Sequence, residues 1–339
     1  MSNTNPHFKT LIVGSTVLPA NAVLAPMAGL GHVAFREVLA GYGGYGFMVT
    51  EMCNARAVPK ENRHVSPVFR WRDEEASRLV CQIFGGEAEV MARAARRIEA
   101  EGLFGVDINM GCSVSSICKK GYGAALLKDP RRAVAIVRAV REAVACPVMV
   151  KYRTGWENSE DLAVDLARRF EDAGADLLTF HPRVAPDRRS RPPRWEHIRA
   201  VARSVTIPVL GNGNIFSAAD CARMLAETGC AGVSIGRMAV ARPWIFAEWS
   251  GGVVAGEDMF LRTALRLIES IWRHFEPARA IKMYKKYAIY LAANFVYGHS
   301  LWPGLVRGET REAMEENAQR ILGGRPQVAS TPNAFLFTS

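Results

Sequence analysis

Between about residues 23 and 245, short apolar runs alternate with longer segments of helical periodicity. Runs this short and unbroken are typical of strands that are buried on both faces, as in a parallel sheet. The chain has eight of them: VLAPMAG from Val23, FMVTEM from Phe47, LVCQIFG from Leu79, GVDINMG from Gly105, PVMVKYRTG from Pro147, DLLTFHPR from Asp176, PVLGNGN from Pro208 and AGVSIGRM from Ala231.

The segments between these runs predict helices. Residues 87–101 form an amphipathic pattern rich in Ala and Arg, and Asp129 followed by Pro130 is typical of a capped helix start over 130–144. Ser217 and Asp220 resemble a capping box that opens a helix to residue 228. Eight strand–helix units predict an α/β fold, a closed (β/α)8 TIM barrel rather than an open doubly wound sheet. Residues 11–13 and 17–19 are expected to form a hairpin that plugs the bottom of the barrel.

The pattern changes after Trp249. Residues 251–258 have the composition of a linker, and residues 260–322 are helical throughout, with no strand-like run. We therefore expect a TIM-barrel catalytic domain over 1–250, a small helical domain over 251–325 and a disordered tail over 326–339.

Basic and aromatic residues are interleaved in the middle helix of the C-terminal region, a composition that suits an RNA-binding surface. The alternative is a solvated face with tyrosines packed against the barrel. The residues are Arg279, Lys282, Lys285 and Lys286 with Tyr284, Tyr287 and Tyr290; Arg188, Arg189 and Arg191 are further candidates for phosphate contacts.

The chain of 339 residues has a formal net charge of +10 and a pI of about 9.5, which favours a polyanionic partner unless the whole proteome is basic. No apolar stretch is long enough to predict a membrane span, and the N-terminus MSNTNPHFKT lacks the features of a secretory signal, so we expect a cytoplasmic protein. Seven cysteines with no CxxC pair argue against a disulfide framework and a zinc ribbon, and no metal site is expected.

Polar residues stand where six successive predicted strands end. In such barrels the carboxyl ends of the strands form the active site, so these side chains should face one rim. They are Gln82, Asn109 with Cys112, Lys151 with Arg153, His181 with Arg183, Asn212, and Gly236 with Arg237.

Glycines at the last two strands suggest a phosphate-binding cup. The run Gly211–Asn214 precedes one predicted helix, and Gly236 with Arg237 precedes another. Glycine lets the backbone approach an anion, and helix N-termini present free N–H groups. The phosphate would belong either to a cofactor or to a sugar-phosphate substrate.

Three of these strand-end side chains, Lys151, Gln82 and Cys112, suit redox chemistry on a flavin ring. Lys151 can stabilise negative charge that develops on a reduced isoalloxazine, and Gln82 can donate to and accept from the pyrimidine edge of such a ring. Cys112, on a loop at the barrel mouth, would act either as a nucleophile or as a proton donor. Cys118, six residues on, is expected only to pack.

In their order and spacing, these motifs resemble the tRNA-dihydrouridine synthases, and among them the bacterial B type. The resemblance covers roughly residues 10–325, and DINMGC before a glycine-rich loop is its most specific part. It rests on APMAG at Ala25, QIFG at Gln82, DINMGC at Asp107, KKGYGAALLKDP at Lys119, KYRTGW at Lys151, GNGN at Gly211 and Gly236-Arg237 with ARPWIF.

The resemblance implies an FMN-bearing barrel, NADPH as the reductant of the flavin, and a C-terminal helical domain that binds tRNA. Hydride would pass from flavin N5 to C6 of a flipped-out uracil, and Cys112 would protonate C5. We expect a monomer. Asn109 and Arg183 are candidates for uracil or RNA contact, and the residues that match FMN contacts are Pro26, Met27, Ala28, Gln82, Lys151, His181, Asn212, Gly213, Asn214, Gly236 and Arg237.

The chain departs from the family pattern at three points. Ser113 replaces a proline after the cysteine, Pro182 replaces the glycine of His-Gly-Arg, and Asn214 replaces an acidic residue after Asn-Gly. Ser113 should alter the stiffness of the cysteine loop. The alternatives are the same chemistry on ribosomal RNA, a flavin barrel acting on a free pyrimidine, and an RNA-binding protein without enzymatic activity.

Overall fold

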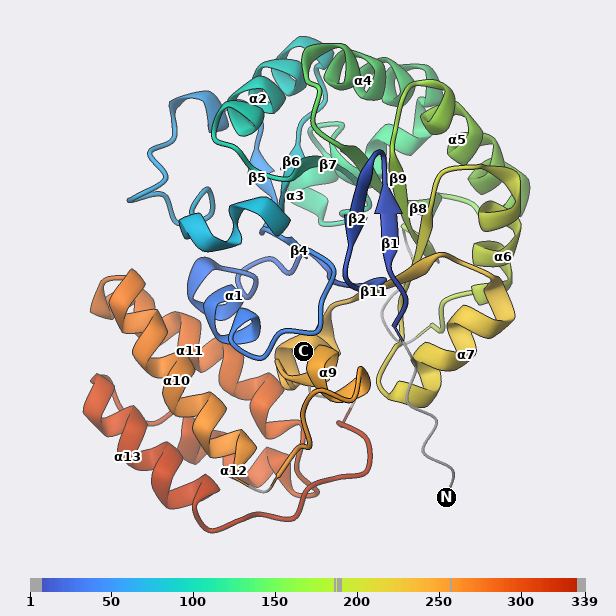
Figure 1. Ribbon diagram of the computed structural model, residues 1–339. Helices are drawn as coiled ribbons and strands as arrows, with labels where there is room; N and C mark the ends of the chain where they lie inside the picture. The colour runs from blue at the N-terminus through green and yellow to red at the C-terminus, as the bar shows by residue number, and fades with distance from the viewer. Residues whose placement is uncertain (1–7, 186, 188–190, 257, 334–339) are drawn as a thin grey trace.

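The computed structural model describes residues 8–185, 187, 191–256 and 258–333. A closed parallel barrel dominates it (Figure 1). Its sheet has nine strands, but β4 and the short β5 (Cys53–Asn54) both pair with β6, so they share one of eight positions around the barrel. The predicted fold class is confirmed. The other strands are β3 (Ala22–Leu24), β4 (Met48–Val49), β6 (Leu79–Phe84), β7 (Gly105–Met110), β8 (Val148–Gly155), β9 (Leu177–Val184), β10 (Val209–Asn212) and β11 (Gly232–Ile235).

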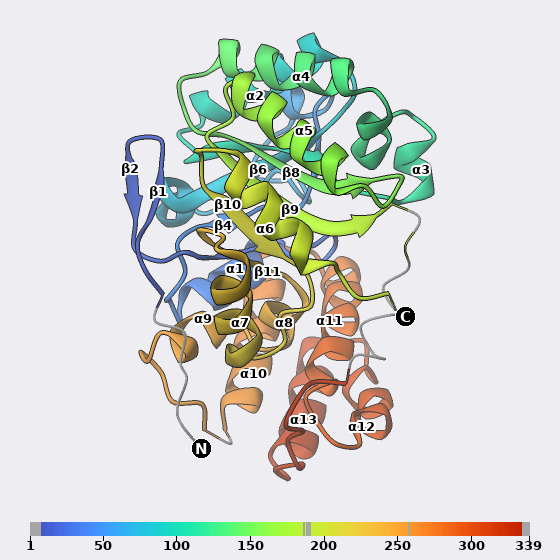
Figure 2. The same cartoon turned by 90° about the vertical axis from the view of Figure 1, so that its right-hand side faces the viewer.

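The predicted N-terminal hairpin closes one end of the barrel (Figure 2). β1 (Leu11–Val13) pairs antiparallel with β2 (Thr16–Leu18). Leu11, Val13 and Leu18 are buried in one cluster with side chains near the starts of the barrel strands, among them Met149 and Leu177. The hairpin therefore fills the amino end of the barrel, which leaves the carboxyl end for the functional site.

Helices cover the outside of the barrel, and the predicted caps are present. Asp129 accepts a hydrogen bond from the Arg132 N–H, and Ser217 accepts one from the Asp220 N–H. The helices of this layer are α1 (Val33–Ala40), α2 (Ala88–Ala100), α4 (Pro130–Ala143), α5 (Glu160–Asp172), α6 (Trp195–Ser204), α7 (Ala218–Thr228), α8 (Arg237–Ala241) and α9 (Ile245–Trp249), and the short α3 (Ser115–Cys118) lies at the carboxyl end.

The C-terminal region is helical, as its periodicity predicts. It consists of α10 (Met259–His274), α11 (Pro277–Ala292), α12 (Gly298–Leu305) and α13 (Arg311–Leu322). Its buried side chains belong to the same apolar cluster as those of the barrel helices, and α10 packs on α1. The expected domain division at residue 250 stays a prediction. None of the helices in the described part of the chain is long and apolar enough to span a membrane.

The expected disordered tail begins at Pro326. Its first part is described: Val328 forms a bridge with Phe295, and the Ala329 N–H donates to the Asn294 carbonyl at 2.8 Å. Residues 334–339 lie outside the described residues.

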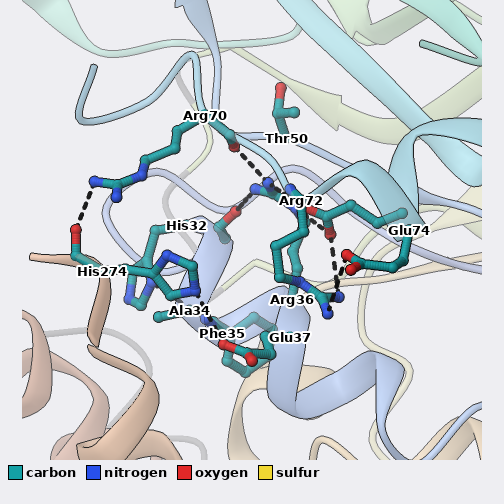
Figure 3. A network of polar contacts seen from close by, with 12 residues as sticks. His32, Ala34, Phe35, Arg36, Glu37, Thr50, Arg70, Arg72, Glu74 and His274 are labelled. Atoms are coloured by element: carbon teal, nitrogen blue, oxygen red, sulfur yellow. Dashed lines mark hydrogen bonds and ion pairs between the residues drawn. The ribbon is translucent and has the colours of Figure 1, made fainter. Parts of the chain in front are cut away.

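A buried arginine joins α1 to the loops beside it (Figure 3). Arg36 is fully buried and forms an ion pair with Glu75 at 2.9 Å. Its guanidinium also donates to the carbonyls of Gly31 and Arg70, at 2.6 and 2.7 Å. Arg70 in turn donates to the carbonyl of His274 at the end of α10. The network thus connects the loop after β3 with the C-terminal helices.

We expect Arg36→Met to destabilise the protein by about 3 kcal/mol, because it removes the closer cation from the buried Glu75 carboxylate and leaves only Arg72, at 3.9 Å. Urea unfolding measures the change. Arg273→Met is the matched control: Arg273 pairs with Glu37 and Glu269 on the surface, where such pairs are worth at most about 1 kcal/mol. Equal losses in both variants would contradict the argument.

Candidate active site

A cavity of about 230 Å³ opens at the carboxyl ends of the barrel strands, the end opposite the hairpin. Residues from β8, β9, β10 and β11, from the segment after β3 and from α11 line it. The lining residues are Ala25, Pro26, Met27, Lys151, Arg153, His181, Arg183, Asp187, Asn212, Gly213, Asn214, Ile215, Phe216, Ser234, Ile235, Gly236, Arg237, Met238 and Tyr290. This is the rim at which the polar strand ends were expected to meet.

The charge of the cavity is strongly positive. Four basic side chains line it, Lys151, Arg153, Arg183 and Arg237, but among its described lining residues Asp187 is the single carboxylate. Asp187 already forms ion pairs with two other arginines, Arg191 and Arg194. Because gathering like charges in a partly buried site is costly, this lining favours an anionic ligand.

One end of the cavity has the form of a cup around Asn214. The Asn214 Oδ1 accepts hydrogen bonds from the guanidinium groups of Arg183 and Arg237, at 3.1 and 3.0 Å. Gly213 has a φ of +119°, and a side chain there would meet the His181 ring. A Cβ on Gly236 would lie 2.8 Å from the Met27 Sδ. Gly213 is therefore required by the geometry, whereas a side chain at Gly236 would need Met27 to move, and the two guanidinium groups suit a phosphate.

Lys151 lies on β8, further along the cavity. Its Nζ donates to the Asn212 Oδ1 at 3.2 Å, and the Asn212 amide donates to the Ser234 carbonyl at 2.6 Å. Burial lowers the pKa of Lys151 to about 8, and the neighbouring Arg153 acts in the same direction. At pH 7 most of the lysine is still charged, so it is a positive group beside the site that loses its charge just above neutral pH.

His181 is a neutral acceptor in this cavity. Burial, together with the positive charges of Arg153 and Lys151, holds the pKa of His181 well below its usual range. Its Nε2 lies 3.3 Å from a guanidinium nitrogen of Arg183, and since an arginine only donates, the imidazole accepts. The ring therefore helps to orient Arg183.

Cys112 lies on the loop that follows β7, the neighbour of β8. In the sheet register Asn109 is opposite Lys151, so Cys112 stands just beyond the rim, one strand away from the lysine. Its side chain is half-buried and does not line the cavity. Its carbonyl accepts from the Ala124 N–H at 2.9 Å and from the thiol of Cys118 at 3.4 Å.

Cys118 differs from Cys112 in its surroundings. Burial raises the pKa of the Cys118 thiol, and that thiol is already a donor to the Cys112 carbonyl. That Cys118 only packs stays a prediction.

Nine of the eleven residues expected to hold a cofactor line the cavity. Ala28 and Gln82 do not: the Ala28 carbonyl accepts from Lys286, and the Gln82 side chain is buried against Asp107 and Asn109. Of the two expected substrate contacts, Arg183 lines the cavity and Asn109 does not. The roles of all these residues remain predictions. The nine are Pro26, Met27, Lys151, His181, Asn212, Gly213, Asn214, Gly236 and Arg237.

Arg153 and Tyr290 are among the lining residues that were not expected to hold a ligand. Arg153 follows Lys151 by two residues and so points to the same side of β8, a signal that was available in the sequence. Tyr290 reaches the cavity from α11, and no sequence pattern distinguishes it from Tyr284 and Tyr287, which are buried in the core.

Comparison with known proteins gives a consistent result. The family model described as dihydrouridine synthase matches residues 23–297. The chain is 34% identical over 268 residues to the probable tRNA-dihydrouridine synthase 1 of Synechocystis, covering 79% of this chain and 75% of that protein. It is 36% identical over 247 residues to tRNA-dihydrouridine synthase B of Pseudomonas putida, covering 73% of each. It is 33% identical to a probable tRNA-dihydrouridine synthase of Mycobacterium tuberculosis, covering 96% of this chain and 88% of that protein.

Solved structures are similar in fold. The old yellow enzyme homologue of Zymomonas mobilis superposes with a TM-score of 0.54 at 12% identity, covering 74% of this chain and 94% of that one. The old yellow enzyme of Trypanosoma cruzi gives a TM-score of 0.55 at 11% identity, covering 75% and 94%. At this identity the likeness concerns the barrel fold alone.

Proposed function

The chain belongs to the dihydrouridine synthase family, and from that premise we propose that it reduces uridine in tRNA to 5,6-dihydrouridine, with FMN at the barrel mouth and NADPH as the reductant. It is a flavin-dependent oxidoreductase by family. We further propose that it acts as a monomer in the cytoplasm, where tRNA is found. The observation that carries the proposal is a cationic cavity, shaped for a phosphate and a ring, one strand away from Cys112.

The residues present fit a flavin mononucleotide. Its phosphate would bind at the cup of Asn214, Gly236 and Arg237, where two guanidinium groups already converge. The ring would lie toward Lys151 and the Pro26–Met27 segment, at the other end of the same cavity. When bound and reduced by NADPH, the flavin supplies the hydride that adds to C6 of the uracil.

Two side chains of this chain act on the developing charge. Lys151 places a positive charge beside the ring, where negative charge gathers on reduction. Cys112 serves as the acid: as the new C6–H bond forms, the electron pair of the C5–C6 double bond moves to C5, and C5 takes the proton of the Cys112 thiol. The thiolate left behind recovers a proton from water. A positioned acid of this kind contributes about 10²–10⁴-fold in rate.

The exposed side of α11 is the proposed RNA surface. Arg279, Lys282 and Lys286 are exposed there, but Tyr284 and Tyr287 are buried, so base stacking on these tyrosines is excluded in this conformation. Lys286 also donates to the Ala28 carbonyl at 2.7 Å, so Lys282 is the simpler phosphate contact. Of the proposed loop contacts, Arg188 and Arg189 lie outside the described residues, and Arg191 pairs with Asp187.

We expect the purified protein to be yellow and to release FMN on heating, as identified by mass. The affinity of the FMN-depleted protein for FMN should fall as the pH rises from 7 to 9, because Lys151, with a pKa of about 8, loses its charge while the phosphate stays fully ionised. Lys151→Met should weaken binding by about tenfold at pH 7 and remove this pH dependence. A flavin titration followed by fluorescence measures both. Colourless protein that does not bind FMN, or bound FAD, would contradict the assignment.

We expect Cys112→Ala to keep its flavin and its rate of flavin reduction by NADPH, but to lose about 10²–10⁴-fold in the rate at which tRNA reoxidises that flavin. Cys118→Ala is the control, since it removes a thiol from the same loop. Stopped-flow measurement of the two half-reactions separates the roles. If free uridine reoxidises the wild-type flavin as fast as tRNA does, the substrate is a free pyrimidine instead.

We expect Lys282→Ala to lower the affinity for tRNA and to flatten the slope of log K against log salt by about one unit, as one phosphate contact is lost. Arg168→Ala removes an exposed charge from α5, on the far side of the barrel from α11 (Figure 1), and should leave the slope unchanged. Filter binding across a range of salt concentrations measures both slopes. Equal slopes for Lys282→Ala and the wild type would mean that RNA binds elsewhere.

A further inference from the structure

A second cavity lies beside the cofactor cavity, the name used here for the cavity at the carboxyl ends of the strands. The volume of the second cavity is about 500 Å³. Gly29 and Glu51 line it from the segments that follow β3 and β4, and Arg279, Lys282 and Lys286 line it from α11. The three cations share one face of this helix, since they lie three and four residues apart.

The two cavities adjoin each other at Lys286. Its Nζ donates to the Ala28 carbonyl at 2.7 Å, and the residues on either side of Ala28 line one cavity each. On α11, Tyr290 of the cofactor cavity lies one turn after Lys286, and Lys282 lies one turn before it. From Tyr290 to Lys282 the helix rises by about 12 Å. A ligand that occupies the cofactor cavity and extends along this face therefore enters the second cavity.

A buried carboxylate in the second cavity has only one of its two oxygens satisfied. Glu51 is 4% exposed, and its Oε1 accepts from the Gly29 N–H. Its Oε2 has no hydrogen-bond or ion-pair partner among the residues that the structure describes. Burial raises the pKa of Glu51, because the charged form loses hydration. A ligand hydroxyl that donates to this oxygen would supply the missing hydrogen bond.

Two cations of the same cavity have no anionic partner within the described part of the chain. Arg279 and Lys282 are exposed, and neither side chain forms an ion pair or a hydrogen bond there, not even with Glu276, the other carboxylate of the lining. The Arg279 guanidinium lies over the Phe275 ring at 5.7 Å, a contact that supports it and leaves its N–H donors available. A phosphate is the anion that such donors bind well. Cations for a phosphate beside a carboxylate for a hydroxyl are the groups that recognise a ribose phosphate.

We propose that the second cavity binds the adenosine end of NADPH, with Arg279 and Lys282 on the 2′-phosphate and Glu51 accepting from the neighbouring ribose hydroxyl. The inference rests on the proposed function, since it takes NADPH as the reductant and places its nicotinamide in the cofactor cavity. The adenosine end must then lie outside that cavity, and the second cavity is the adjoining one along α11.

RNA is the other source of ribose phosphates, but the charge of the cavity favours the reductant. A terminal phosphate has nearly two negative charges at neutral pH, whereas a phosphodiester has one, so two unpaired cations suit the terminal group better. Hydride reaches the flavin before it reaches the uracil, so the reductant and the RNA bind in turn. Lys282 can therefore contact the 2′-phosphate first and an RNA phosphate afterwards.

The test compares NADPH with NADH, which lacks the 2′-phosphate, as reductants of the flavin in the purified protein without RNA. Arg279→Ala and Lys282→Ala should each lower the second-order rate constant for NADPH about tenfold, the scale of a lost charged hydrogen bond, and change that for NADH less than about twofold. The limiting rate at saturating NADPH should stay unchanged, because the nicotinamide still reaches the flavin. Arg168→Ala, which removes an exposed charge from α5, should alter neither rate constant. Stopped-flow absorbance of the flavin measures all four proteins.

Equal losses for NADPH and NADH would overturn the proposal, because they would mean that the substitutions do not act on the 2′-phosphate. Weaker tRNA binding in Arg279→Ala with unchanged NADPH kinetics would also overturn it and assign the cavity to an RNA phosphate.

A binding measurement keeps the site separate from the redox reaction. Calorimetry should show that adenosine 2′,5′-bisphosphate, the adenosine end of NADPH alone, binds the wild-type protein and binds Arg279→Ala about tenfold more weakly. Absence of binding to the wild type, or equal binding to both proteins, would overturn the proposed site. If NADPH and NADH both fail to reduce the wild-type flavin, the proposed function is wrong in its reductant, while this binding result still decides whether the cavity holds a ribose phosphate.

Discussion

Positive charge gathered at the carboxyl ends of β8 to β11 is the constraint on which the rest of the site depends. Charged groups lose hydration when they are buried, and Lys151 shows this cost directly in its pKa of about 8. An anionic ligand offsets the cost by restoring opposite charge. Gly213 belongs to the same region, because its φ is +119° and a side chain there would meet the ring of His181, which lines the cavity.

The parallel sheet places the loop that carries Cys112 beside this positive charge. Adjacent strands lie about 4.8 Å apart, and the register places Asn109 of β7 opposite Lys151 of β8. Cys112, three residues after Asn109 on the loop that follows β7, therefore lies one strand away from the lysine. Strand register alone does not fix the direction of the Cys112 side chain, because the turn that carries it lies beyond the last strand pair. The backbone of that turn is restrained by hydrogen bonds, two of which run from the N–H groups of Gly111 and Cys112 to the Asn109 Oδ1.

The sequence predicted those parts of the structure that depend on interactions between residues close together in the chain. Strands buried on both faces give unbroken apolar runs, and Asp129 and Ser217 cap helices by short-range bonds, so their positions were predictable. The ends of the strands likewise predicted most of the cavity lining. The direction of Gln82 was not predictable, because its amide turns toward Asp107 and Asn109, partners on the neighbouring strand. The sequence also could not predict that Tyr290, and not Tyr284, lines the cavity, because this depends on how α11 lies against the barrel.

The position of α11 also means that the proposed RNA surface and the cavity are parts of one structure. Tyr290 of this helix lines the cavity, and one turn earlier Lys286 donates to the Ala28 carbonyl. Ala28 directly follows Pro26 and Met27, which line the same cavity, and the buried Glu51 accepts from the adjacent Gly29 N–H. A displacement of α11 would therefore move Tyr290 in the cavity wall and would also change the contact of Lys286 with the Ala28 backbone. The proposed RNA surface and the cavity therefore share one helix, which carries Lys282 on its exposed side and places Tyr290 in the cavity wall.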